Sequence, residues 1–180
     1  MDISIVRTEK KYGITWRQKN ALLHRLEPVI HVDQYSGMKG YMVRSLYFDS
    51  IYDNDYFDKI SGLELRKKIR LRIYSPEQTV IRLELKQKQG SAQKKTSLSI
   101  TKKLADEMIC GNYTGLAELN SGLALNFYQI LETGLYRPKC IIEYHRIAFA
   151  EGSNDTRITI DSEIGTSLPR LLIRKHEIVQ

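Results

Sequence analysis

Positively charged side chains alternate with aliphatic ones along residues 68–88, and these charged residues are the ones best placed to do chemistry. Because successive side chains of a strand point to opposite faces, an extended chain places the charges on one face. That face holds a single carboxylate, Glu84, among six basic side chains. Like charges directly opposite one another destabilise a sheet, so a face of nearly one sign favours an anion as its partner. The charged residues are Lys68, Arg70, Arg72, Arg82, Glu84, Lys86 and Lys88.

The residues between the charges predict the buried face of the same strands. They are all aliphatic, and the SPEQT segment at residues 75–79 has the composition of a turn, so the stretch is predicted to be an antiparallel hairpin. An ordinary half-buried sheet with a merely solvated charged face is the alternative. The predicted buried residues are Ile69, Leu71, Ile73, Ile81, Leu83 and Leu85.

Composition narrows the class of protein. The chain has 180 residues, 42% of them hydrophobic and 27% charged, which is enough for one globular domain with a substantial core. No apolar run approaches the ~20 residues that span a bilayer, and the first residues lack the layout of a secretion signal. Cys110 and Cys140 have no metal-ligand spacing, so we expect reduced structural thiols in the cytoplasm. The net charge of +7 favours polyanionic partners.

Helices and further strands are predicted on both sides of the hairpin. Thr15 and Gln18 form a capping-box pattern at the start of a helix that Pro28 ends. Residues 102–110 and 121–132 carry apolar side chains at helical spacing and are followed by glycine. Strands are predicted at residues 4–12, 43–49, 140–149 and 157–161, a short helix or ordered turn within 50–62, and a flexible loop at 90–95.

These elements predict an α+β fold in which helices cover the apolar face of a curved antiparallel sheet. The charged faces of the strands then turn toward one another. Desolvating a cluster of like charges costs several kcal/mol per ion, so the enclosed space must hold water and an anion. We therefore expect a single domain over residues 1–180, built as a β-barrel or tunnel with a charged lumen and helices outside.

The sequence resembles the VTC domain, the polyphosphate-polymerase module of the triphosphate tunnel metalloenzyme (CYTH-like) superfamily. The stretch YFDSIYDNDYFDKISGLELRKKIRLRIY, from Tyr47 to Tyr74, carries much of the resemblance. The other pieces fall in the family's order across nearly the whole chain. They are Glu9-Lys10-Lys11-Tyr12, Arg66-x-x-x-Arg70-x-Arg72, Glu84-x-Lys86, a lysine near Lys95, Tyr144-x-Arg146 and Arg157-x-Thr159-x-Asp161.

The resemblance implies a set of site residues, in which basic side chains bind a phosphate chain and the phosphates bind Mn²⁺ or Mg²⁺. The catalytic residues would be Lys11, Arg70, Arg72, Lys86, Arg146 and Arg157. Substrate binding would add Arg66, Lys88, Lys95 and Tyr144, with Lys94 as the alternative to Lys95. The candidate metal ligands are Glu9, Glu84 and Asp161, although Glu9 and Glu84 could each pair with a neighbouring Arg or Lys instead.

The implied function is transfer of the terminal phosphoryl group of ATP to a growing polyphosphate chain. Positioning and charge neutralisation supply most of such catalysis, so arginines, lysines and a metal suffice without a nucleophile. The alternatives are hydrolysis of tripolyphosphate or another triphosphate by the same superfamily, and a non-catalytic polyphosphate-binding module.

The expected partners are ATP and inorganic polyphosphate or tripolyphosphate. Nucleic acid is not expected, because the charged faces lack exposed aromatic side chains that stack on bases. A membrane partner stays open, although no transmembrane segment is predicted.

One departure from the family pattern concerns the C-terminus. The family's final strand carries a Leu-Glu-x-Lys stretch whose glutamate binds the metal, and this chain stops at HEIVQ, residues 176–180, about where that strand should begin. We therefore expect either a truncated piece or a chain without that ligand, in which triphosphate binding survives better than phosphoryl transfer.

Overall fold

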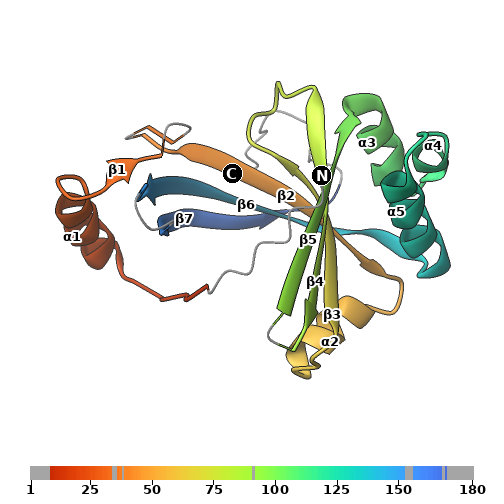
Figure 1. The fold of residues 1–180 in the computed structure, drawn as a ribbon, viewed down its shortest axis with the longest axis horizontal. Coiled ribbons are helices and arrows are strands. Elements are labelled where there is room, and N and C mark those ends of the chain that lie inside the picture. The colour runs from red at the N-terminus through yellow and green to blue at the C-terminus, as the bar shows by residue number, and fades with distance from the viewer. Residues whose placement is uncertain are drawn as a thin grey trace. The chain divides into compact units, whose positions relative to one another are not determined.

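The structure is a computed structural model of the chain, and it describes residues 9–33, 36–37, 39–90, 92–152, 156–167 and 169. One sheet contains strands in the order β1-β6-β2-β3-β4-β5, with β7 pairing to β6 (Figure 1). The elements in chain order are α1 (Trp16–Leu26), β1 (His31–Val32), β2 (Tyr41–Ser50), α2 (Asn54–Ile60), β3 (Arg66–Ile73), β4 (Val80–Gln89), β5 (Ala92–Thr101), α3 (Lys102–Ile109), α4 (Thr114–Ala117), α5 (Gly122–Thr133), β6 (Tyr136–Ala150) and β7 (Arg157–Ser167).

The chain divides into two compact units. Among the described residues, the first unit contains residues 44–142 together with 166, 167 and 169, and the second contains residues 9–43 and 143–165 apart from the gaps given above. Strands β2, β6 and β7 each contribute residues to both units.

Three antiparallel strands form the centre of the first unit. The predicted hairpin is confirmed as β3 and β4, which are joined across the turn that contains Pro76. The prediction of a flexible loop at residues 90–95 was wrong, because β5 begins at Ala92 and pairs with β4 along its whole length. The first residues of β5 do not alternate between apolar and polar side chains, so the sequence did not indicate a strand there. Pairing with β4 supplies the backbone hydrogen bonds that make this segment a strand.

The apolar faces of these strands are covered by helices. Leu71, Leu83 and their neighbours are fully buried in one core cluster with side chains of α3, α4 and α5, which gather on one side of β3–β5 (Figure 1). The helices predicted at 102–110 and 121–132 are confirmed as α3 and α5, while the short α4 was not predicted. Gly111, directly after the C-cap residue Cys110 of α3, has a φ of 83°, a conformation that favours glycine over residues with a side chain.

The second unit has its own small core. The side chain of Thr15 accepts a hydrogen bond from the amide of Gln18, and the Gln18 side chain accepts one from the amide of Thr15, so the predicted capping box is confirmed. The leucines of α1 pack against β6 and β7, where Phe149 is fully buried. Residues 9–12 are not a strand, contrary to the prediction, and the earlier part of that predicted strand lies outside the described residues, as does HEIVQ at 176–180.

The predicted α+β class is confirmed as an antiparallel sheet with helices on its apolar face. Within the described part of the chain, no helix combines the length and the apolar character needed to cross a membrane.

Candidate anion-binding site

The charged faces of β3, β4 and β5 form one surface in the first unit. Strand pairing places their side chains in rows across the sheet: Lys68, Lys86 and Lys95 form one row, and Arg70, Glu84 and Ser97 form the next. A third row contains Arg72, Arg82 and Ser99. Glu84 is the only acidic residue in these three strands, so the surface is strongly basic. We call it the basic face, and it comprises Arg66, Lys68, Arg70, Arg72, Arg82, Glu84, Lys86, Lys88 and Lys95.

Glu84 lies at the centre of the basic face and is nearly buried. Its Oε2 lies 2.7 Å from Nη2 of Arg70 and 3.8 Å from Nη1 of Arg72, and its Oε1 forms an ion pair with Lys95. Burial alone would raise the pKa of Glu84, but Arg70, Lys95 and Arg72 outweigh burial and hold that pKa below its ordinary value. Glu84 is therefore an ionised carboxylate at neutral pH.

Arg70 is held from two sides. Its Nε donates to Glu84 Oε2 at 2.7 Å, and its Nη1 donates to the hydroxyl of Tyr47 on β2 at 3.0 Å. Burial would lower the pKa of Arg70, yet Tyr47 and Glu84 raise it above its ordinary value. The sequence did not predict Tyr47 as a site residue, because its role depends on the pairing of Tyr47 with Arg70 across two strands.

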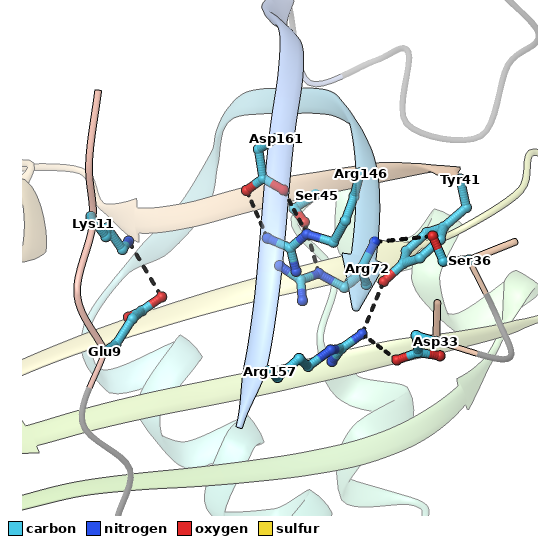
Figure 2. Close-up of polar contacts among 11 residues, drawn as sticks. Glu9, Lys11, Asp33, Ser36, Tyr41, Ser45, Arg72, Arg146, Arg157 and Asp161 are labelled. Carbon is cyan, nitrogen blue, oxygen red and sulfur yellow. Dashed lines mark hydrogen bonds and ion pairs between the residues drawn. The ribbon is translucent and has the colours of Figure 1, made fainter. Parts of the chain in front are cut away.

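Arg72 occupies the neighbouring row and is also oriented by β2. Its Nε donates to the hydroxyl of Ser45 at 3.1 Å (Figure 2). Arg72 is mostly buried, whereas Lys86 and Lys88 on β4 are more exposed. The basic face thus combines fixed guanidinium groups with lysines that reach solvent, and both kinds of group can donate charge-assisted hydrogen bonds to an anion such as phosphate.

Strand register separates the two candidate lysines of β5. Lys95 pairs with Lys86 and contacts Glu84, so it lies on the basic face. Lys94 pairs with Gln87 and has the opposite parity. The geometry therefore favours Lys95 over Lys94.

The remaining predicted residues lie in the second unit, where Arg146 is the most constrained. Its Nε and Nη2 donate to the two carboxylate oxygens of Asp161 at 2.6 and 2.7 Å (Figure 2). Its guanidinium carbon also lies 5.0 Å from the ring centre of Tyr144. Burial would lower the pKa of Arg146, but the hydrogen bonds to Asp161 outweigh burial and raise it.

Arg157 and Lys11 each have an acidic partner within the second unit. Nη2 of Arg157 lies 3.0 Å from Oδ2 of Asp33 and 3.3 Å from the hydroxyl of Tyr41 (Figure 2). Nζ of Lys11 lies 3.8 Å from a carboxylate oxygen of Glu9, and both side chains are largely exposed. The predicted residues thus form two groups, one on the basic face and one in the second unit.

The three predicted metal ligands are each in contact with a basic side chain: Glu9 with Lys11, Glu84 with Arg70, and Asp161 with Arg146. Among the residues that the structure describes, no three His, Cys, Asp or Glu side chains come together as a potential metal cage. Mg²⁺ usually keeps several waters and binds proteins through one or two carboxylates together with substrate phosphates. The described carboxylates are therefore compatible with Mg²⁺ that is held mainly by a phosphate ligand.

Comparison with known proteins gives a family match and a structural likeness. The sequence profile of the VTC domain matches residues 6–177. No curated protein matches the sequence. The fold is similar to the crystal structure of a putative adenylate cyclase from Bacillus halodurans, with a TM-score of 0.53 and 14% sequence identity over 83% of this chain and 69% of that one.

Proposed function

The chain belongs to the VTC domain family, and from this premise we propose that its basic face binds the phosphate chain of ATP or of inorganic polyphosphate. We further propose that the protein transfers the terminal phosphoryl group of ATP to a growing polyphosphate chain. Membership of the VTC family supports the first proposal, and the second proposal narrows phosphate binding to one reaction.

The observation that carries the proposal is the composition of the basic face. Its strands hold one carboxylate among basic side chains from three adjacent rows, and that carboxylate is already paired with Arg70 and Lys95. A linear chain of phosphates offers negative charge at regular intervals, which matches basic groups repeated along a strand. Arg146 and Arg157 in the second unit stay predicted phosphate ligands on the strength of the family resemblance alone.

This chain's own residues would bind and orient the phosphates. Arg70 and Arg72 would each donate to phosphate oxygens from a guanidinium fixed by β2, while Lys86 and Lys95 neutralise negative charge. Phosphoryl transfer needs in-line positioning and neutralisation of the equatorial oxygens more than covalent participation of the protein. Mn²⁺ or Mg²⁺, carried on the phosphates, would supply further charge neutralisation when bound.

The reaction is tested by incubating the protein with ATP and Mn²⁺ and separating the products on a polyacrylamide gel stained for polyphosphate. We expect ADP together with a ladder of polyphosphate, formed slowly, because the sequence predicts that triphosphate binding survives better than phosphoryl transfer. ADP and free phosphate without a ladder would contradict polymerisation and identify a hydrolase. Binding of tripolyphosphate without turnover of ATP would contradict catalysis and identify a binding module.

Lys86→Ala serves as the site variant in the same assay, and Lys103→Ala on α3 is the matched control, since each replaces an exposed lysine by alanine. Loss of product in the first variant and not in the second assigns the reaction to the basic face. Equal products from both variants would contradict that assignment.

A further inference from the structure

We propose that Glu84 and Tyr47 are positioning residues that hold the guanidinium of Arg70 in place for a phosphate ligand, and that Glu84 serves this site as an internal counter-ion and not as a metal ligand. This inference rests on the proposed phosphate binding by the basic face. It assigns roles to two side chains that do not themselves contact the phosphate.

The guanidinium of Arg70 has more hydrogen-bond donors than its contacts with Glu84 and Tyr47 use. An arginine has five N–H donors in one rigid plane. Nε and Nη2 of Arg70 both lie 2.7 Å from Oε2 of Glu84, and Nη1 donates to Tyr47. Contacts on two sides of the guanidinium fix its plane, and the contacts among the described residues leave one N–H donor on Nη1 and one on Nη2. These two donors are available to an anion.

The exposed fraction of the side chain increases from Glu84 through Arg70 to Lys95. The side chain of Glu84 is 4% exposed, that of Arg70 is 21% exposed and that of Lys95 is 52% exposed. An anion that approaches the basic face therefore meets the cations before it meets the carboxylate. The same order keeps Glu84 away from a cation that arrives on the outer side of a phosphate chain.

Glu84 also links the strands of the basic face. Glu84 is on β4, Arg70 and Arg72 are on β3, and Lys95 is on β5. Like charges opposite one another destabilise a sheet. One carboxylate beneath three cations offsets this repulsion, so the basic side chains stay assembled before the ligand binds.

The sign of the effect of Glu84→Gln on binding separates positioning from simple electrostatics. Removing a negative charge from a basic surface strengthens the attraction for a polyanion. Releasing a long side chain that was held in its bound orientation weakens binding by roughly three- to tenfold. We expect weaker binding of tripolyphosphate by Glu84→Gln, measured by isothermal titration calorimetry in EDTA.

The matched control is Glu118→Gln, which removes an exposed carboxylate after α4 and should leave the affinity for tripolyphosphate within about twofold of the wild type.

Tyr47→Phe tests the same inference without a change of charge, and it covers the case in which Glu84→Gln fails to fold. Loss of one hydroxyl should weaken tripolyphosphate binding by roughly threefold. In an Arg70→Ala background the same change should have no further effect, because Tyr47 acts through Arg70. Tyr52→Phe, at an exposed tyrosine, is the matched control.

A second readout does not require a ligand. The ¹⁵N relaxation of the Arg70 Nε–H group should indicate an ordered side chain in the wild-type protein and a more mobile one in Tyr47→Phe.

The outcomes separate the two proposals. Either of two results would overturn the positioning roles while leaving phosphate binding intact. One is unchanged or tighter binding by Tyr47→Phe and Glu84→Gln. The other is a full additional loss of binding from Tyr47→Phe in the Arg70→Ala background. Absence of tripolyphosphate binding by the wild-type protein would overturn the proposed function, and the positioning roles with it.

Discussion

Asp55 is a carboxylate at the start of α2 that is only 5% exposed. The hydroxyl of Tyr136 lies 2.8 Å from both of its oxygens, and Nζ of Lys67 lies 3.9 Å from one of them. Burial raises the pKa of Asp55 to about 6, and the hydrogen bond from Tyr136 offsets burial only in part. The helix thus buries a polar group where the sequence alone would place an exposed one.

The raised pKa of Asp55 predicts a pH dependence of stability. Its folded-state pKa of about 6 lies above the reference value of 3.8, so the folded protein binds this proton more tightly than the unfolded chain does. The resulting stabilisation is complete below pH 3.8 and is lost as the pH rises to 6. A shift of two pKa units corresponds to about 3 kcal/mol, taken as an upper bound.

Asp55→Asn removes the titration and keeps the shape of the side chain. We expect the free energy of unfolding of the wild type, relative to Asp55→Asn, to fall by up to about 3 kcal/mol between pH 4 and pH 7. Urea unfolding of both proteins at each pH measures this difference, and other titrating groups cancel because both proteins share them. A difference that is constant with pH would show that Asp55 titrates at its ordinary pKa.

At the residue scale, the sequence predicted which side chains face the same way but not which ones touch. Parity placed Arg70, Arg72 and Glu84 together, and the strands confirm that placement. The contact between Glu84 and Lys95, and that between Arg70 and Tyr47, depend on strand neighbours and register. Strand neighbours and register are set by turns and core packing far from these residues.

At the element scale, β4 buries one face in the core that it shares with the helices, and its other face is part of the basic face. Leu83 has no exposed surface, while its neighbour Arg82 is exposed. We expect Leu83→Asp to unfold the first unit, because a buried unpaired carboxylate costs several kcal/mol. Arg82→Asp introduces the same side chain one residue away, and it should stay folded while binding tripolyphosphate more weakly.

Circular dichroism and calorimetric titration of the two variants test this assignment. A folded Leu83→Asp and an unfolded Arg82→Asp would show that the two faces of β4 are assigned in reverse. Tripolyphosphate binding by Arg82→Asp at the wild-type affinity would contradict the placement of the ligand on the basic face.

Elements with strong periodicity were the ones that the sequence predicted well. Alternation in β3 and β4, and the capping pattern of α1, correspond to local physical causes that the chain carries itself. The start of β5 lacks such a pattern, since Ala92, Gln93 and Lys94 precede its first buried residue, Thr96. Its strand conformation depends on β4 as a partner, which no single-segment pattern can indicate.

At the scale of the whole molecule, the net charge of +7 is not in itself evidence for a site, because any polyanion is attracted to a basic protein. A phosphate site on the basic face makes binding depend on where the charges lie. Lys86 lies on the basic face, whereas Lys103 lies on α3, which packs against the opposite, apolar face of the same strands. Both lysines are exposed, and each alanine substitution lowers the net charge equally.

The most direct test is calorimetric titration of tripolyphosphate into the wild-type protein, Lys86→Ala and Lys103→Ala at moderate salt without metal. A charge-assisted hydrogen bond to phosphate contributes roughly 1.5–3 kcal/mol, so Lys86→Ala should weaken binding about tenfold or more. Lys103→Ala should stay within about twofold of the wild type, since salt screens a distant exposed charge. Equal losses in the two variants would show that tripolyphosphate follows net charge alone and would contradict a phosphate site on the basic face.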